Sequence, residues 1–228
     1  MLIPRLSIED ARLEVIKWIG VALMTGDHIN KYLFADQWHV VFNAGRVVMP
    51  LFVIVLAYNL ARPNTMNKGV YGRTMKRLLI AGLVATPAFI ALGGLVSGWW
   101  PLNIMMTLFI MTVILYLIEQ GSRTSKTAAV ILMLVGGSSV EFWWPAIVLG
   151  VSVWNYCKKQ AVTWVIIGFV ALAALRVING NYWAFAALPI IAIVNYLPVH
   201  IPRQKWFFYT FYPVHLTLIL AVSRIGII

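Results

Sequence analysis

Long apolar segments follow one another along the whole chain and are separated only by short polar joints. Of the 228 residues, 61% are hydrophobic and only 11% are charged, which is too apolar for the surface of a soluble globule of this size. Only helices or a closed barrel satisfy the backbone in lipid, and the chain lacks the two-residue alternation of barrel strands. We therefore expect an all-α, polytopic membrane protein with one integral-membrane domain over residues 1–228.

The apolar windows predict about nine transmembrane helices. Some of these windows, notably 127–141, 144–157 and 184–197, are shorter than the roughly 20 residues that a helix needs to cross a bilayer. A re-entrant pair therefore stays an alternative for two of the short windows. The complete set of windows is 15–33, 40–61, 78–96, 102–119, 127–141, 144–157, 161–178, 184–197 and 206–226.

The distribution of basic residues predicts the orientation of these helices. If the N-terminus is cytoplasmic, nearly all Lys and Arg residues lie on the inner side, and the exceptions are Lys31, Arg46, Arg176 and Arg224. The positive-inside rule therefore places the N-terminus in the cytoplasm and, for an odd number of spans, the C-terminus outside. Topology explains the formal net charge of +11 better than nucleic-acid binding does, so we expect lipid contacts and no nucleic-acid partner.

Two histidines lie well inside apolar windows, where an ionisable side chain is costly and usually functional. His28 belongs to the sequence Gly-Asp-His-Ile-Asn of residues 26–30, and His215 follows Pro213, which removes one helix hydrogen bond. Histidine is the candidate acid or base near neutral pH, because no serine or cysteine nucleophile motif is present. The histidines show no paired spacing and the one cysteine stands alone, so no metal is expected. Core packing stays an alternative role for each histidine.

The charged neighbours of His28 form a second pattern. On a regular helix Asp27 points about 100° away from His28 and cannot orient its ring, whereas Lys31 shares the face of Asp27. Arg46 lies a few residues into the next apolar window, where a guanidinium needs an anion, and Asp27 is the obvious partner. A purely structural ion pair between the first two spans stays an alternative to a role at a reaction site.

The stretch 62–77 is strongly basic and contains no acidic residue. Its residues Arg73, Lys76 and Arg77 follow i, i+3, i+4 spacing, so a helix would carry them on one face. Such a face suits a polyphosphate ligand, because arginine pairs with phosphate oxygens through two parallel hydrogen bonds. A topology signal or a contact with anionic lipid explains the same residues without a ligand.

These motifs resemble the TraX family, the pilin N-terminal acetylases of conjugative plasmids, within the broader membrane acyltransferase-3 superfamily. In the superfamily an arginine precedes the catalytic histidine by eleven positions, and Lys17 holds that place ahead of His28. An Arg-x-x-Arg pattern that binds coenzyme A phosphates in the superfamily is matched by Arg73 and Lys76, with Arg77 adjoining. Over roughly 105–205 only the hydropathy is similar. The residues that carry the resemblance are Lys17, 27–30, 44–46, 50–52, Phe211, Tyr212, His215 and Leu216.

The resemblance implies a multi-pass acetyltransferase of a bacterial inner membrane. It would move acetyl from cytosolic acetyl-CoA, as donor substrate, to the N-terminal amine of a membrane-held pilin subunit. His28 would act as general base, Arg46 would bind Asp27 or the acceptor backbone, and His215 would stabilise the oxyanion or hold the thioester carbonyl. The donor would be bound by Lys17, Arg73, Lys76 and Arg77.

Two other functions stay open on the residues alone. A small proton-coupled secondary transporter also uses buried His, Asp and Arg residues in proline-broken helices. A non-catalytic pilus assembly factor would leave the histidines and the basic stretch purely structural. A gain of one acetyl group on the N-terminus of a co-expressed pilin would distinguish the enzyme from both.

Overall fold

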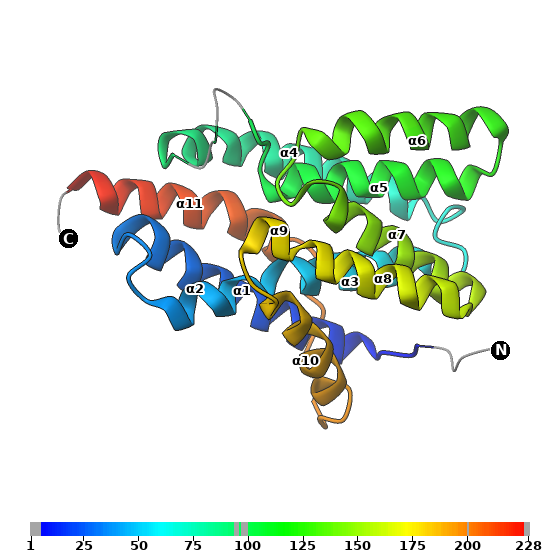
Figure 1. Cartoon of the computed structure of the whole chain (residues 1–228), viewed down its shortest axis with the longest axis horizontal. Helices are drawn as coiled ribbons and strands as arrows, with labels where there is room; N and C mark the ends of the chain where they lie inside the picture. The colour runs from blue at the N-terminus through cyan, green and yellow to red at the C-terminus, as the bar shows by residue number, and fades with distance from the viewer. Residues whose placement is uncertain (1–5, 94–95, 97–99, 200, 226–228) are drawn as a thin grey trace.

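The computed structural model describes residues 6–93, 96, 100–199 and 201–225 (Figure 1). Within these ranges the regular elements are helices, and an isolated β-bridge joins Leu102 to Val140 outside any named strand. The prediction of an all-α fold is confirmed. The elements are α1 Asp10–Leu33, α2 His39–Gly45, α3 Val48–Ala61, α4 Val70–Ala91, α5 Ile104–Gln120, α6 Arg123–Ser138, α7 Trp143–Lys159, α8 Val162–Ala174, α9 Arg176–Asn179, the 3-10 helix η1 Trp183–Ala186, α10 Ala187–Val194 and α11 Phe207–Ile225.

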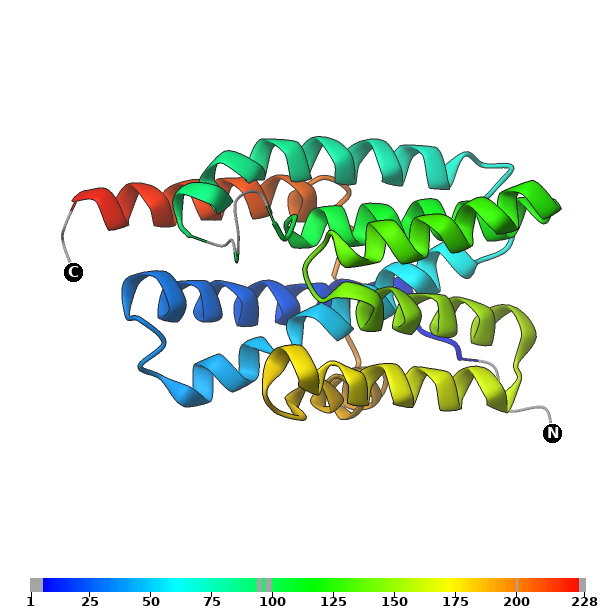
Figure 2. The same cartoon turned by 45° about the horizontal axis from the view of Figure 1, so that its top comes forward.

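The long helices lie side by side along the longest axis of the molecule (Figures 1 and 2). The N-terminal end lies on the same side as the loops that join α3 to α4, α5 to α6 and α7 to α8, whereas α11 ends on the opposite side (Figure 1). The basic residues of 62–77, 123–126 and 158–159 therefore gather at one end of the bundle. The positive-inside rule would place that end of the bundle in the cytoplasm, and this orientation stays a prediction.

Four helical segments of the described chain are long and apolar enough to cross a membrane: His39–Ala61, Val70–Ala91, Val162–Asn179 and Phe207–Ile225. The first of these combines α2 and α3, which meet at a break before Pro50. Pro50 has no N–H to bond the Arg46 carbonyl, and Arg46 and Val47 instead make tighter i to i−3 bonds to Asn43 and Ala44. The expected windows 127–141 and 144–157 fall in α6 and α7, of 16 and 17 residues.

The expected span 184–197 differs most from the structure. It forms η1 and the eight-residue α10, which runs across the direction of the long helices (Figures 1 and 2). Two such short helices reach about 20 Å if they are collinear, well below the roughly 30 Å of a hydrocarbon core. Instead α10 buries Ile191 and Val194 in a cluster with Ile16 and Leu51 of α1 and α3.

The position of α1 against α2 and α3 determines the geometry of the site. Near its start, Asp10 pairs with Arg62 at 2.5 Å, and this hydrogen bond holds the pKa of Asp10 below its usual value. Farther along, Gly20 packs against Phe52, whose ring leaves little room for a Cβ atom. Near its end, a Cβ on Gly45 would collide with Asp27, so glycine allows α2 to approach α1 closely there.

Candidate functional site

His28 of α1 and His215 of α11 face each other in the interior. Their Nδ1 and Nε2 atoms are 2.7 Å apart, and the rings stack with centroids 5.0 Å apart and an interplanar angle of 9°. Phe211 stacks on His215, and Tyr32 and Tyr212 make edge-type ring contacts with His28. The contact joins the first long helix to the last through two residues that are 187 positions apart in the sequence.

The hydrogen bonds of the pair define which nitrogen of His28 is basic. His215 Nδ1 lies 3.1 Å from the Phe211 carbonyl oxygen, which only accepts, so Nδ1 carries the hydrogen. In neutral His215 the Nε2 atom then accepts a hydrogen bond, and His28 Nδ1 donates it. This network assigns the lone pair of neutral His28 to Nε2, the atom that a general base uses.

Asp27 and Arg46 form the ion pair that the sequence predicted. Arg46 Nη2 lies 2.8 Å from both carboxylate oxygens, its Nε donates to the Phe42 carbonyl at 3.2 Å, and its guanidinium carbon lies 4.2 Å from the centre of the Phe42 ring. No ion pair joins Asp27 to Lys31 among the described residues. The pair therefore connects α1 to the break between α2 and α3.

His28, Asp27 and Arg46 line one cavity of about 290 Å³, which we call the outer cavity. The carboxyl group of Glu141, from the turn before α7, also lines it. His215 does not line this cavity, and it contacts His28 instead. The remaining lining residues are Met24, Lys31, Tyr32, Asp36, Phe42, Gly45, Val48, Met49, Ile104, Phe142, Ile178 and Tyr212.

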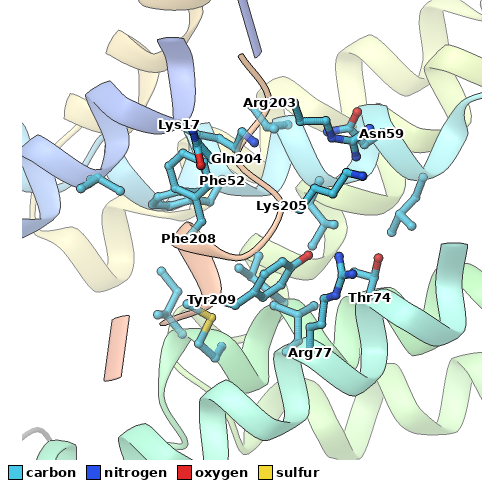
Figure 3. Close-up of a pocket in the computed structure, with 18 of the residues that line it drawn as sticks. Lys17, Phe52, Asn59, Thr74, Arg77, Arg203, Gln204, Lys205, Phe208 and Tyr209 are labelled. Atoms are coloured by element: carbon cyan, nitrogen blue, oxygen red, sulfur yellow. The ribbon is translucent and has the colours of Figure 1, made fainter. Parts of the chain in front are cut away.

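A second cavity, of about 160 Å³, opens toward the other end of the bundle, and we call it the inner cavity (Figure 3). Its cationic residues come from three different segments: Lys17 from α1, Arg77 from α4, and Arg203 with Lys205 from the loop before α11. The deeper wall is apolar and includes Leu108. A site with cationic side chains at one part and apolar side chains at another fits an anion that carries an uncharged arm.

Packing contacts hold two of these cations, Lys17 and Arg77, in place. Lys17 pairs with Glu14 and lies 4.3 Å from the centre of the Phe208 ring. Arg77 lies over the Trp206 ring at 4.2 Å, and the Gln204 backbone N–H donates to Glu14 at 3.3 Å. The loop before α11 is therefore connected to α1 and α4 around the inner cavity.

Comparison with known proteins identifies the family. The family model described as TraX protein matches residues 12–223. This chain belongs to the TraX family. Protein TraX of Escherichia coli is 30% identical over 125 residues, which are 54% of this chain and 47% of that protein. Protein TraX of Escherichia coli strain K12 is 29% identical over 127 residues, with the same coverage, so the match spans about half the length of these relatives. No solved structure matches.

In this TraX-family chain the predicted donor-binding residues separate into two groups. Lys17 and Arg77 line the inner cavity, whereas Arg73 and Lys76 are exposed and do not. The side of α4 that lines the inner cavity carries Val70, Thr74, Arg77 and Leu78. Arg77 is therefore the one predicted α4 residue that reaches it.

Sequence reasoning missed Arg203 and Lys205 as site residues. Both lie in a short joint before the last span, where the positive-inside rule alone explains basic residues. One pattern in the sequence could have indicated them: Arg203 and Lys205 are two positions apart and stand directly before an apolar segment that begins with aromatic residues. Across the described ranges no group of three His, Cys, Asp or Glu residues is arranged to hold a metal ion.

Proposed function

We propose that this TraX-family chain is a membrane-embedded acetyltransferase. It moves acetyl from acetyl-CoA to the N-terminal amine of a membrane-held pilin subunit, as the motif resemblance implies. The observation that carries the proposal is the pairing of His28 with His215, which leaves His28 Nε2 as a base in a cavity next to a second, cationic cavity.

The reaction needs one base and one bound thioester. The neutral amine attacks the acetyl carbonyl carbon, a C–N bond forms and the C–S bond breaks. The proton released from nitrogen passes to His28 Nε2 and then to the leaving thiolate of coenzyme A, so His28 returns to its neutral form. His215 is a positioning residue in this scheme, because it holds the hydrogen on His28 Nδ1 through Nε2.

The inner cavity supports acetyl-CoA as the donor. The four cations Lys17, Arg77, Arg203 and Lys205 suit its phosphates, and the apolar wall suits its uncharged arm. Lys17 and His28 are on one helix, eleven residues and about 16 Å apart along its axis. A donor with phosphates near Lys17 would therefore reach His28 only with an extended arm that carries the thioester at its end.

Neutralising Arg203 and Lys205 tests the donor site. We expect the double variant Arg203→Gln, Lys205→Gln to raise the KM for acetyl-CoA roughly 10- to 100-fold, because two exposed charged contacts of about 1 kcal/mol each sum to about 2 kcal/mol and every 1.4 kcal/mol is a factor of ten. The KM for the pilin acceptor should change little. The matched control is Arg73→Gln, Lys76→Gln, which removes the same charge from equally exposed positions that do not line the inner cavity. An equal effect of both double variants would contradict this donor site.

His215 can be tested by separating its hydrogen-bonding role from its packing role. We expect His215→Leu to lower kcat about 10- to 100-fold, because no acceptor remains for His28 Nδ1–H. His215→Gln supplies an amide oxygen at a similar reach and should recover much of the rate. If His215 only packs, the apolar leucine should retain activity and the polar glutamine should be worse. Purified, correctly inserted protein is compared in each case.

Mass spectrometry of a co-expressed pilin tests the function itself. We expect one acetyl group on the pilin N-terminus with the wild-type chain and none with an empty vector. Two cavities that approach each other from opposite ends also occur in secondary transporters. A pilin that stays unmodified, together with solute flux into vesicles that contain the purified chain, would replace the enzyme by the transporter.

A further inference from the structure

The inner and outer cavities share two wall residues. Met24 of α1 and Ile104 at the start of α5 line both cavities, and no other described residue does so. Both side chains are almost fully buried, at 5% and 7% exposure. The two cavities are therefore adjacent, and this pair of apolar side chains contributes a surface to each of them.

We propose that Met24 and Ile104 form a thin apolar partition between the inner cavity and the outer cavity, and that this partition limits the length of the acyl group that reaches His28. The selectivity part rests on the proposed acyltransferase function. Neither the motifs nor the family resemblance assigns a role to these two residues.

The position of Met24 connects the partition to the base. Met24 precedes His28 by four residues on α1, so the two side chains share one face of the helix, one turn apart. A group that passes Met24 from the inner cavity therefore arrives next to His28. Lys17 lies about two turns before Met24 on the same helix. A molecule that moves along α1 from the inner cavity would therefore meet Lys17 first, then Met24, and then His28.

The two sides of the partition differ in rigidity. Ile104 follows Asn103, whose side chain accepts from the Met105 N–H at 3.1 Å and donates to the Gly82 carbonyl and to Thr86 Oγ1 at 3.0 and 3.1 Å. These bonds fix the start of α5 against α4. Met24, in contrast, is unbranched and has three rotatable bonds, so it is the side chain that can move aside.

This arrangement predicts a size limit on the acyl group. An acetyl group is short enough to pass with a small movement of Met24, whereas each added methylene must displace more of the wall. One methylene in an apolar pocket changes relative rates by about 10- to 200-fold. The same apolar partition would also separate water in the two cavities, since hydrophobic constrictions dewet.

Three methionines provide a matched set for testing selectivity. Met24 lines both cavities, Met105 lines only the inner cavity, and Met49 lines only the outer cavity. We expect Met24→Ala to raise the ratio of butyryl to acetyl transfer about tenfold or more. Met105→Ala and Met49→Ala should leave this ratio within about twofold. An unchanged ratio in well-inserted Met24→Ala, or the same rise in all three variants, would overturn the selectivity role.

Cysteine labelling tests the partition without any acyl transfer. In a Cys157→Ser background, cysteines at positions 24, 105 and 49 are treated with the membrane-impermeant, anionic reagent sulfonatoethyl methanethiosulfonate from either face of sealed vesicles. We expect Met24→Cys to react from both faces, Met105→Cys only from the face that carries Arg203, and Met49→Cys only from the opposite face. Reaction of Met24→Cys from one face alone would overturn the partition.

The acyl-transfer ratio and the cysteine labelling test separate parts of the proposal. A wild-type chain that transfers no acyl group removes the proposed function, while the labelling pattern still decides whether the partition exists. Labelling from both faces with an unchanged acyl ratio would retain the partition and remove its role in selectivity.

Discussion

His28→Ala is expected to lower the rate of acetyl transfer by about 10²- to 10⁴-fold, the usual contribution of a positioned general base. The loss should appear in kcat, because His28 lines the outer cavity and is absent from the inner cavity, where the donor is proposed to bind. The KM for acetyl-CoA should therefore stay near that of the wild type. Initial rates with purified, detergent-solubilised protein and a pilin N-terminal peptide measure both quantities.

The matched control for this variant is His39→Ala. His39 is the exposed first residue of α2 and lines neither cavity, so its removal should leave the rate unchanged. Correct folding of both variants is checked by comparing the thermal unfolding of the purified proteins with that of the wild type. A well-folded His28→Ala protein with the wild-type rate would eliminate His28 as the base, whatever the outcome for His215.

The residues around His28 could be found in the sequence because lipid makes polar groups conspicuous. An ionisable side chain inside an apolar window is costly and usually functional. Each of four residues could therefore be recognised as a candidate on its own, namely His28, His215, Asp27 and Arg46. Opposite charge then predicted the Asp27–Arg46 pair, which the structure forms at 2.8 Å. The tautomer of His28 could not be predicted from the sequence. It depends on the Phe211 carbonyl and on how α1 packs against α11, and His28 and His215 are 187 positions apart.

The cationic lining of the inner cavity was only partly predictable, because a positive-inside signal and a ligand site both explain basic residues near the end of a span. The i, i+3, i+4 spacing gave the relative direction of Arg73, Lys76 and Arg77 but not the rotation of α4 against its neighbours. That rotation buries Thr74 and directs Arg77 toward the inner cavity. The sequence also did not predict that α10 runs across the long helices, because hydropathy measures the length of an apolar segment and carries no information on its tilt.

The paired charges of Asp27 and Arg46 lead to the largest expected change in stability. Arg46→Leu leaves a mostly buried carboxylate without its cation, and breaking a buried pair on one side typically costs about 3–5 kcal/mol. We expect a corresponding fall in the free energy of unfolding, measured by denaturant titration in mild detergent. Asp27→Asn should cost less, because its amide oxygen still accepts from Arg46.

The double variant Asp27→Asn, Arg46→Leu decides between a structural pair and a functional one. With no charge left unpaired, it should regain much of the stability that Arg46→Leu loses, because most of that loss comes from the stranded carboxylate and not from the missing contact. If the pair only fixes α1 to α2, the folded double variant should acetylate pilin at a rate near that of the wild type. A stable but inactive double variant would instead give the pair a role at the acceptor, since His28 and the whole inner cavity are unchanged in it. A double variant less stable than Arg46→Leu would contradict the stranded-charge explanation itself.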